Sequence, residues 1–432
     1  MKVILLSGGS GKRLWPLSND IRSKQFIKIF KNENGELESM VQRIYSQIKA
    51  VDPTAIVTIA TSKSQVSTIH NQLGTDVGIS VEPCRRDTFA AIALATAYLH
   101  DIKGVSENEA VVVCPVDPFV EDEYFKTMFE MCREAETSNS NLVLMGIEPT
   151  YPSEKYGYIK PSSNAWSFTE KPTKDKAEEY IASGALWNGG VFAYKLSYVL
   201  NKSKELLGTS DYDSLFSNYE NLKKISFDYA VVEQETSIKV LKYSGTWQDL
   251  GTWNTLTEAM EEQIIGNAIL NDTCSNVHVI NELGIPVLVM GGHDLVVSTS
   301  PEGILVSDKE ESSKIKPFVD AIDQQIMFAE KSWGSYRVLD VEEESMTVKV
   351  TLDPLQRMNY HSHEKRDEIW NVIAGSGHTI VDGMEQPIRP GDVITMSAGC
   401  KHTVVAGECG LQLIEVQLGK DITVLDKKKY EL

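Results

Sequence analysis

The sequence has no closely spaced cysteine pairs and no long apolar segment. None of its six cysteines forms a Cys-x-x-Cys pair, which argues against a disulfide framework and indicates reduced, mostly structural thiols. No segment approaches the roughly 18 consecutive apolar residues that a membrane-spanning helix needs. The first apolar run, near the N-terminus, is also too short for the core of a signal peptide. We therefore expect a cytoplasmic protein that does not associate with membranes.

Positive charge is scarce as well. The chain carries 42 Lys and Arg residues against 61 Asp and Glu residues, which gives a net charge of −19. A balance this acidic argues against binding to nucleic acid or to an anionic membrane surface. A small anionic substrate would have to be captured by local cations or by Mg²⁺, against the overall field. The length of 432 residues leaves room for two or three domains.

Three patterns succeed one another along the chain. Strand-like and helix-like segments alternate over residues 1–265, which predicts an α/β domain with a mostly parallel sheet. Short β runs separated by turns begin residues 266–330, and a connecting helix is expected over Glu310–Lys331. Residues 331–432 hold strands alone, which is typical of an all-β sandwich or barrel. The charged end, Asp426–Leu432, is expected to be a solvated terminus.

The stretch Val3–Lys28 carries the first sign of a ligand site. A short apolar strand, Val3–Leu6, runs directly into a glycine-rich loop, where positive φ is allowed and backbone N–H groups can approach a ligand. With Lys12, Arg13 and Lys24 close behind, this loop suits a triphosphate. Its spacing fits neither a P-loop nor a dinucleotide-binding fingerprint, and a tight turn without a ligand is the alternative. The residues that we expect at the phosphates are Gly8, Gly9, Ser10, Gly11, Lys12 and Arg13.

Two aspartates far from this loop are candidate metal ligands. Asp117 ends an apolar run, and Asp249 lies in the string TWQDLGTW. Nucleotidyl transfer depends on positioning and charge neutralisation rather than on covalent chemistry by the protein. Two carboxylates that converge on one Mg²⁺ would supply this, with Lys24 neutralising the transferred phosphoryl group. Each aspartate also has a simpler interpretation, as a helix N-cap or a turn residue.

These stretches resemble those of a known enzyme family. The string GGSGKRLWPLS, followed by Lys24-Gln25-Phe26, closely resembles the signature of the sugar-nucleotide pyrophosphorylases, and specifically of the mannose-1-phosphate guanylyltransferases. Further family elements follow in order, as YGYI, EKP, WNGG and FDYAVVEQ. The resemblance implies a Rossmann-like nucleotidyltransferase domain and then a β-helix-like module of a kind often used in self-association. The chain departs from the family at Asp87, where Asn is usual and base specificity is affected, and at Pro118, where His is usual.

The resemblance also assigns roles to individual residues. It implies that catalysis depends on Arg13, Lys24, Asp117 and Asp249, with the two aspartates holding Mg²⁺. Besides the loop, it implies that the nucleotide is contacted by Glu82, Arg85 and Asp87. It implies that the sugar phosphate is contacted by Gly157, Glu170, Lys171, Asn188 and Glu233.

The C-terminal part contains a candidate transition-metal site. Alternate residues of a strand share one face, so His361 and His363 can converge with Glu368 and His402. Three imidazoles and a carboxylate suit Zn²⁺, Fe²⁺, Ni²⁺ or Mn²⁺, whereas ordinary surface histidines are the alternative. The spacing resembles the two motifs of the cupin barrels. A transferase joined to a cupin resembles bifunctional enzymes that also isomerise mannose 6-phosphate to fructose 6-phosphate, and Zn²⁺ is the metal that we expect.

The isomerase signature is altered in this chain. The family has a compact Gln-x-His-x-His-Arg-x-Glu-His-Trp, whereas this sequence has two inserted residues, Asn359 in place of Gln and Ile369 in place of the later His. A polar side chain at that later position matters for moving a proton between neighbouring carbons. Two interpretations therefore stand, an active isomerase and a structural or regulatory metal-binding domain.

We predict an Mg²⁺-dependent enzyme that makes GDP-mannose and pyrophosphate from GTP and mannose 1-phosphate. We expect it to act as a homodimer or a larger homo-oligomer. One alternative is a nucleotidyltransferase for another nucleotide or sugar 1-phosphate, with a non-catalytic metal-binding cupin. Another is a catalytically silent regulator that senses a sugar nucleotide, although binding alone would not require the whole set of catalytic residues.

Overall fold

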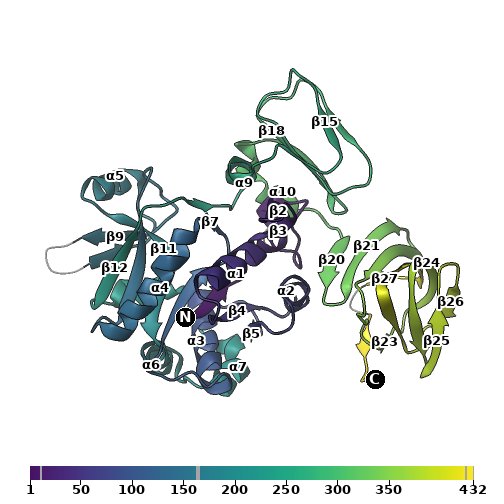
Figure 1. Cartoon of the computed structure of the whole chain (residues 1–432), viewed down its shortest axis with the longest axis horizontal. Coiled ribbons are helices and arrows are strands. Elements are labelled where there is room, and N and C mark those ends of the chain that lie inside the picture. The colour runs from purple at the N-terminus through teal and green to yellow at the C-terminus, as the bar shows by residue number, and fades with distance from the viewer. Residues whose placement is uncertain (10–11, 162–165, 424–425, 432) are drawn as a thin grey trace. The chain divides into compact units, whose positions relative to one another are not determined.

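The computed structural model describes residues 1–9, 12–161, 166–423 and 426–431 (Figure 1). The chain folds into two compact units. The first unit consists of Met1–Ser10, Lys24–Val66 and Asp76–Glu261, and the second of Gly11–Ser23, Ser67–Thr75 and Glu262–Leu432. Two short N-terminal segments thus belong with the C-terminal half. The division into three domains, at residues 265 and 330, stays a prediction.

One large mixed sheet dominates the first unit, in the order β10-β9-β11-β6-β1-β4-β5, with β8 pairing with both β11 and β12. Its strands are β1 (Lys2–Leu6), β4 (Ile56–Ser62), β5 (Gly78–Glu82), β6 (Ala110–Pro115), β8 (Leu142–Ile147), β9 (Tyr158–Pro161), β10 (Trp166–Thr169), β11 (Leu186–Lys195) and β12 (Ile238–Tyr243). Strands β5, β4, β1 and β6 run parallel, as do β8 and β12. The predicted α/β fold with a mostly parallel sheet is confirmed.

Two small sheets and a set of helices complete this unit. The small sheets pair β2 (Lys28–Lys31) with β3 (Leu37–Ser39), and β7 (Pro118–Val120) with β13 (Trp247–Asp249). The helices are α1 (Met40–Val51), α3 (Asp87–Ala97), α4 (Asp122–Thr137), α5 (Lys174–Ala182), α6 (Leu196–Leu207), α7 (Tyr212–Ser217), α8 (Phe227–Ala230) and α9 (Trp253–Ala259). Helix α1 starts where Ser39 and Gln42 form a reciprocal capping box. Helix α3 is almost wholly buried, because its alanines let it lie close to the sheet.

The central position of β1 in the core explains where the glycine-rich loop lies. Strand β1 sits between β4 and β6, and its Val3, Ile4 and Leu5 are fully buried. A central parallel strand is covered on both faces, so it reads as a continuous apolar run rather than an alternating one. Ligands of such sheets bind beyond the carboxyl ends of the strands, and the glycine-rich loop begins at that end of β1.

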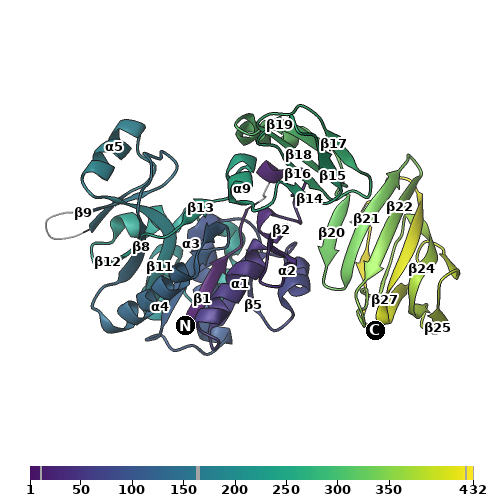
Figure 2. The ribbon, with the colours of Figure 1, turned by 45° about the horizontal axis from the view of Figure 1, so that its top comes forward.

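The second unit begins with a module of short stacked strands. Strands β14 (Ile264–Ile265), β16 (His278–Asn281) and β18 (Leu295–Ser300) pair in parallel, as do β15 (Ala268–Leu270) and β17 (Val287–Val289), while β19 (Gly303–Asp308) pairs antiparallel with β18. Figure 2 shows β14, β16 and β18 side by side. The expected β-helix-like module requires short parallel strands that stack on one another. Val279 of β16 and Val297 of β18 form its small core, with Val277 beside them.

The expected helix over Glu310–Lys331 is wrong in its second half. A 3₁₀ turn, Glu311–Lys314, leads into a short helix α10 (Lys316–Asp320), and Phe328–Lys331 forms strand β20. Pro317 stands at the start of α10, where its missing N–H costs nothing. Beyond it the backbone hydrogen bonds of β20 go to the next strand, so the residues after Asp320 do not continue the helix.

The rest of the second unit is an antiparallel barrel-like sheet. Its strands are β20, β21 (Gly334–Val341), β22 (Ser345–Leu352), β23 (His361–Ser362), β24 (Arg366–Val381), β25 (Met384–Ile388), β26 (Val393–Met396), β27 (His402–Gly419) and β28 (Lys428–Lys429). The strict alternation of buried and half-buried residues along β22 shows one face turned to the core. The long strands β24 and β27 pair over most of their length. The predicted cupin barrel is confirmed.

The end of the chain is a solvated terminus only in part, because the side chains of Lys428 and Lys429 are exposed but their backbone is paired. Strand β28 pairs with β23, with Lys429 opposite His361. The Asp426 carboxylate accepts hydrogen bonds at 3.0 Å from the backbone N–H groups of both Glu364 and Lys365. A charged composition predicts exposure, but here the backbone of the terminal segment completes the sheet. Helix α2 (Val66–Leu73) belongs mainly to this unit. Among the helices in the described ranges, none has the length and apolarity that crossing a membrane demands.

Candidate functional sites

The first site is built around Lys24 and the two predicted aspartates. The antiparallel pairing of β13 with β7 places Asp249 opposite Pro118, and therefore beside Asp117. The ammonium of Lys24 lies 2.7 Å from Asp117 Oδ2 and 3.5 Å from Asp249 Oδ1. Burial disfavours the charged lysine, but the attraction of both carboxylates outweighs it and raises the pKa of Lys24. The structure thus brings three of the four predicted catalytic residues together.

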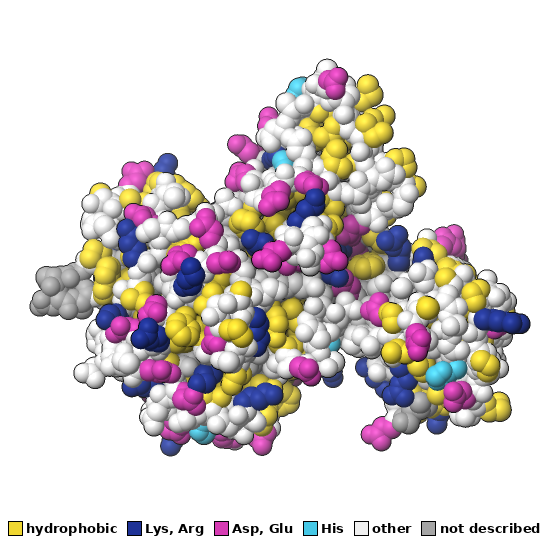
Figure 3. Space-filling view, viewed as in Figure 1, with side chains coloured by type: hydrophobic (Ala, Val, Ile, Leu, Met, Phe, Trp, Pro, Cys, Tyr) yellow, Lys and Arg dark blue, Asp and Glu magenta, His cyan; other side chains and the backbone are white. Residues whose placement is uncertain are grey.

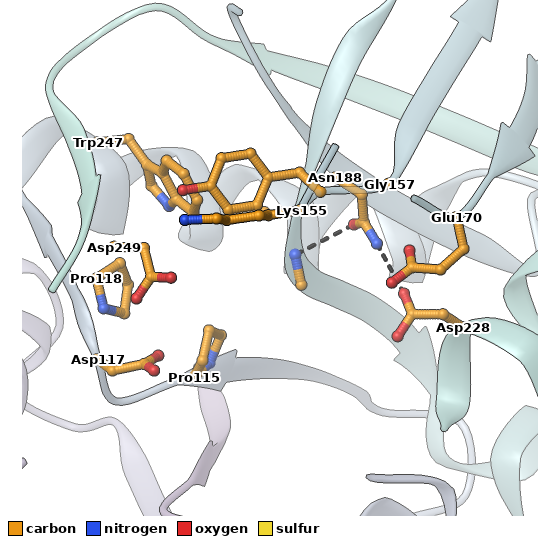
Figure 4. A pocket seen from close by; sticks show the side chains of 13 residues that line it. Pro115, Asp117, Pro118, Lys155, Gly157, Glu170, Asn188, Asp228, Trp247 and Asp249 are labelled. Carbon is orange, nitrogen blue, oxygen red and sulfur yellow. Dashed lines mark hydrogen bonds between the residues drawn. The ribbon is translucent and has the colours of Figure 1, made fainter. Parts of the chain in front are cut away.

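The two aspartates fit a hard divalent cation. Figure 4 shows their carboxylates turned toward the same space, beside Pro115 and Pro118. They offer only oxygen donors, and their side chains are 37% and 40% exposed, which leaves room for water and phosphate oxygens in the coordination sphere. A Cβ at Gly251 would lie 3.2 Å from an Asp249 oxygen, so glycine there spares this carboxylate a tight contact. Magnesium prefers such a site, with one or two carboxylates and the remaining ligands from solvent and substrate.

A polar pocket of about 230 Å³ opens beside the aspartates. At its far end Asn188 Nδ2 donates a 2.7 Å hydrogen bond to Asp228 Oδ1, and the Asn188 side-chain oxygen accepts from the N–H of Gly190 (Figure 4). Burial, together with the neighbouring charge of Glu170, raises the pKa of Asp228 to about 6. Gly157 is required here, because a Cβ would lie 2.5 Å from Glu170 Oε2. Carboxylates and an amide that gather around a glycine are suited to forming hydrogen bonds with the hydroxyl groups of a ligand.

Aromatic rings form another wall of this pocket. The rings of Tyr156 and Trp247 lie 5.1 Å apart, and Trp187 packs against both. Lys155 also lines the pocket, with its side chain near Trp247 in Figure 4. Neither Lys155 nor Asp228 was among the predicted contacts, although Asp228 lies within the FDYAVVEQ string. Lys155 has no signal in the sequence beyond its place next to YGYI.

Two predicted sugar-phosphate residues contact Glu170 instead of lining the pocket. The ammonium of Lys171 lies 2.9 Å from Glu170 Oε1. The carboxylate of Glu233 accepts a 3.4 Å hydrogen bond from the backbone N–H of Glu170. Lys171 therefore contacts the Glu170 carboxylate itself, whereas Glu233 contacts only its backbone.

A second cleft of about 470 Å³ meets the first pocket at Pro115 and Asp117. It collects most of the residues predicted at the nucleotide, together with Lys224, which the sequence did not single out. The predicted residues that line it are Gly8, Gly9, Lys24, Glu82, Arg85, Asp87 and Asp117. The hydroxyl of Tyr219 donates a 2.8 Å hydrogen bond to Glu82 Oε2 and fixes that side chain.

The backbone conformation at Asp87 explains why an aspartate is tolerated where the family has an asparagine. Its φ of 66° is left-handed, a conformation that Asn and Asp adopt more readily than most residues. Its carboxylate accepts a 2.8 Å hydrogen bond from the N–H of Thr88 at the start of α3. Replacing an amide with a carboxylate therefore preserves the local turn while changing what the cleft offers to a base.

The remaining loop residues fall elsewhere. Ser10 and Gly11 lie outside the described residues. Lys12 and Arg13 belong to the second unit, where the Lys12 ammonium lies 3.2 Å from Asp320 Oδ1 and Arg13 is exposed. The lining of the nucleotide-side cleft comes from the first unit, so it does not include these two cations.

The barrel brings its predicted metal ligands together. The nitrogens that His361, His363 and His402 offer lie within 4.8 Å of one another, and each side chain is at most 3% exposed. Strand pairing sets His361 opposite His402. Glu368 closes the cluster, with its two oxygens 3.1 Å from His363 Nε2 and 3.2 Å from His402 Nε2. The predicted set of three imidazoles and one carboxylate is thus assembled.

This cluster fits a transition metal. The Nδ1 atoms of His361, His363 and His402 each lie against a backbone carbonyl oxygen, which leaves the Nε2 atoms facing inward. Burial lowers the pKa of His361 to about 2 and that of His363 to about 4, so both imidazoles are neutral, as ligation requires. Glu368 Oε2 and His402 Nε2 lie close but make no hydrogen bond. Buried polar atoms without partners are costly unless an ion satisfies them.

A cavity of about 320 Å³ borders the cluster at His361 and His363 and is rich in cations. Its lining includes Lys331, Arg366, Lys427 and Lys429, together with Glu415, Gln417, Ile21 and Ser67. Sequence reasoning missed Lys427 and Lys429 because it assigned them to a solvated terminus. Burial raises the pKa of Glu415 to about 8 and lowers that of Lys427 to about 8.

The altered isomerase position does not face this cavity. Along β24 the residues Arg366, Glu368 and Trp370 are buried in alternation, and Ile369 lies between them on the opposite face. Asn359, the other replaced residue, does line the cavity. The substitution at Ile369 therefore leaves the inner surface of the barrel unchanged.

Two protein families match the chain. The model of the family described as nucleotidyl transferase matches residues 2–264, and that described as mannose-6-phosphate isomerase C-terminal matches residues 321–431. The chain belongs to the nucleotidyl transferase family. The family match confirms the predicted nucleotidyltransferase and its C-terminal isomerase-type barrel.

Known members of similar organisation share a little over a quarter of the sequence. A mannose-1-phosphate guanylyltransferase of Salmonella montevideo is 27% identical over 99% of this chain and 98% of its own length. The alginate biosynthesis protein AlgA of Pseudomonas aeruginosa is 26% identical over 99% of this chain and 96% of its own. Among solved structures, the crystal structure of a mannose-1-phosphate geranyltransferase from Thermus thermophilus superposes with a TM-score of 0.62. It is 28% identical and covers 74% of this chain and 99% of its own.

Proposed function

We propose that the chain transfers a guanylyl group from GTP to mannose 1-phosphate, which yields GDP-mannose and pyrophosphate. The observation that carries this proposal is the meeting of two pockets at Asp117. One pocket has the glycine loop and basic residues suited to a nucleotide, and the other has the carboxylates and aromatic wall suited to a sugar. The names of the similar proteins support the choice of guanylyl and mannose.

In the proposed reaction, a phosphate oxygen of mannose 1-phosphate attacks the α-phosphorus of GTP. The bond from that phosphorus to the oxygen that bridges to the β-phosphate breaks, and pyrophosphate leaves with the electron pair. Lys24 is placed to neutralise the transferred phosphoryl group. Mg²⁺, held by Asp117 and Asp249, would supply further charge neutralisation. The roles that the sequence predicts for Lys12 and Arg13 at the triphosphate stay predictions.

The far end of the first pocket is the proposed sugar site. Glu170, Asn188 and Asp228 offer a carboxylate, an amide and a second carboxylate within one cluster, which suits recognition of neighbouring hydroxyls. The rings of Tyr156 and Trp247 offer an apolar face for the C–H side of the sugar ring. Lys155, next to these rings, is the proposed contact for the sugar phosphate.

The test is a matrix of substrates. Purified protein is incubated with Mg²⁺ and each nucleoside triphosphate against a panel of sugar 1-phosphates, and pyrophosphate release is followed. We expect GTP with mannose 1-phosphate to give the highest kcat/KM. A clear preference for another pair of substrates would show that the proposed substrates are wrong, although the proposed class of reaction would stand. Tight binding of a sugar nucleotide without turnover on any pair would favour the silent regulator.

We further propose that the barrel isomerises mannose 6-phosphate to fructose 6-phosphate, with Zn²⁺ in the cluster of His361, His363, Glu368 and His402. The cations of the cavity suit a phosphate group in a chain that is otherwise strongly acidic. Isomerisation moves a proton between neighbouring carbons, and Glu415 and Lys427 are two cavity groups that exchange protons near neutral pH. Formation of fructose 6-phosphate by the Zn²⁺-loaded protein tests this. Its absence with every divalent metal would leave a non-catalytic metal-binding barrel.

The β module is the proposed surface for self-association. Its six most exposed large apolar side chains are each 59–69% exposed, and Figure 3 shows hydrophobic side chains gathered on this part. Ile269 and Leu288 are paired neighbours on β15 and β17. Exposed apolar patches of this kind mark interfaces. Analytical ultracentrifugation should give a dimer or larger species that Leu288→Glu dissociates, and an unchanged assembly would place the interface elsewhere.

A further inference from the structure

Two lysines of the second unit face the barrel cavity without an opposite charge. Lys331, at the end of β20, and Lys429, on β28, both line this cavity. Within the part of the chain that the structure describes, neither ammonium pairs with a carboxylate. Lys331 instead lies against the ring of Tyr336, with its ammonium 5.5 Å from the ring centroid. The cavity therefore holds two unpaired cations in a chain whose net charge is −19.

The two ammonium groups also repel each other. Burial lowers the pKa of Lys331, and the positive charge of Lys429 lowers it further. Lys427, which lines the same cavity, differs from them because the charge of Glu415 attracts it. Two like charges held close together destabilise the protein as long as no anion lies between them. A ligand with two negative charges would remove the repulsion between Lys331 and Lys429.

Strand pairing explains why Lys429 faces the cavity. Strand β28 pairs antiparallel with β23, which places Lys429 opposite His361 and Lys428 opposite the next residue, Ser362. Side chains that are directly opposite in an antiparallel pair lie on the same face, whereas neighbours along a strand alternate. Lys429 therefore shares the inner face with His361. Lys428 does not line the cavity, and its ammonium lies 5.7 Å from the ring centroid of Tyr430.

Contacts on both sides of β28 fix its position. The backbone N–H of Tyr430 donates a 2.9 Å hydrogen bond to the carbonyl oxygen of Tyr360. The Tyr430 hydroxyl lies 3.1 Å from Ser362 Oγ. Before the strand, the Asp426 carboxylate accepts two backbone hydrogen bonds. The backbone that carries Lys429 is thus ordered without a ligand, and a preorganised site loses less entropy on binding.

We propose that Lys331 and Lys429 bind the phosphate group of the substrate in the barrel. This rests on the proposed isomerase function. A phosphate monoester carries about −1.5 to −2 charges at neutral pH, which matches two lysines. The cavity borders the metal-ligand cluster at His361 and His363, so a sugar phosphate held by these lysines can turn its sugar portion toward the cluster. Strand β28 then supplies a substrate contact besides completing the sheet.

The test measures the binding of phosphate compounds by charge-removing variants. Lys331→Met and Lys429→Met each remove one charge but keep a long apolar side chain. The Zn²⁺-loaded protein is titrated in a calorimeter with fructose 6-phosphate and with inorganic phosphate. Each variant should bind both compounds about tenfold more weakly or worse, because a charge-assisted contact is lost.

Two matched variants separate a specific contact from a general loss of charge. Lys428→Met removes the same charge from the neighbouring residue outside the cavity, and its affinity should stay within about twofold of the unchanged protein. Lys429→Arg keeps the charge and should retain most of the affinity. In the isomerase assay, Lys429→Met should raise the KM for mannose 6-phosphate at nearly unchanged kcat, because the phosphate group does not react.

The outcomes distinguish the phosphate contact from the isomerase function. Unchanged affinity in folded Lys331→Met and Lys429→Met would overturn the contact, and so would a failure of the unchanged protein to bind either compound. Thermal midpoints without ligand check folding, and Lys429→Met alone decides if Lys331→Met does not fold, since the Lys429 side chain is exposed. If the lysines bind fructose 6-phosphate but no divalent metal supports isomerisation, the isomerase function fails and the phosphate contact stands.

Discussion

The two candidate sites differ most in their exposure. The side chains of Asp117 and Asp249 are 37% and 40% exposed, whereas the four polar side chains in the barrel are 2–3% exposed. Burying two carboxylates costs several kcal/mol per ion unless cations accompany them. The transferase site therefore stays open to water and holds its charge with Lys24. The barrel site can be buried because three of its four side chains are imidazoles that can stay neutral, and Arg366 bonds to its one carboxylate, Glu368, at 2.9 Å.

This contrast predicts different chemistry at the two sites. An open pair of carboxylates suits a hydrated, exchangeable ion such as Mg²⁺ and a charged phosphate substrate. A buried imidazole cluster suits a tightly held transition metal. The following changes test whether the two sites work independently and whether exposure sets their behaviour.

The largest effect is expected from Asp249→Asn. The change preserves size but removes one of the two charges that would hold Mg²⁺, so pyrophosphate release should fall to background at any practical Mg²⁺ concentration. Initial rates over a Mg²⁺ titration are the measurement. Glu148→Gln, which breaks an exposed pair with Lys242 in the same unit, is the matched control. Normal turnover by Asp249→Asn would refute the metal assignment.

The second-largest effect on activity is expected from Lys24→Ala. Because its ammonium acts on charge that develops in the transition state, kcat should fall by roughly 10² or more. Steady-state kinetics in both substrates separate kcat from KM. Lys126→Ala serves as the control, since Lys126 pairs with its helical neighbour Glu123 on the surface. A rise in KM at unchanged kcat would make Lys24 a ground-state binding residue.

His361→Ala tests the independence of the sites. The variant should lose bound transition metal, because one of three buried imidazole ligands is gone, while pyrophosphate release stays within about twofold of normal. Metal analysis and the transferase assay are run on the same preparation. His378→Ala, at a half-exposed histidine of the same barrel, should keep the metal. A collapse of transfer in His361→Ala would show that the two sites are coupled.

The smallest effect is expected at Asp228, and it concerns how the KM for the sugar 1-phosphate depends on pH. Its pKa is raised to about 6, so the carboxylate accepts sugar hydroxyls above that pH and becomes protonated below it. The KM for the sugar 1-phosphate should rise several-fold as pH falls through this pKa. Asp228→Asn should have a raised KM with no such inflection. An identical pH profile in both proteins would exclude Asp228 from sugar binding.

Local patterns predicted the elements of this molecule well. The apolar run Val3–Leu6 is a central strand, and the histidines at 361 and 363 share the inner face of the barrel. These features follow from residue periodicity and backbone preference, which act over a few residues. The same logic failed at Glu310–Lys331, where Phe328–Lys331 forms a strand because β21 offers it hydrogen bonds.

The sequence by itself determined the order of the elements, the family and most of the residues that gather at the two sites. Tertiary structure alone decided which distant residues meet. The pairing of β13 with β7 sets Asp249 beside Asp117, β28 carries Lys429 into the barrel wall, and Glu282 holds Arg22. Such contacts join residues far apart in the chain, so no local pattern marks them, and the charged composition of the C-terminal segment gave no sign that Lys427 lines the barrel cavity. They form because the folded backbone satisfies its hydrogen bonds and pairs its buried charges only in this arrangement.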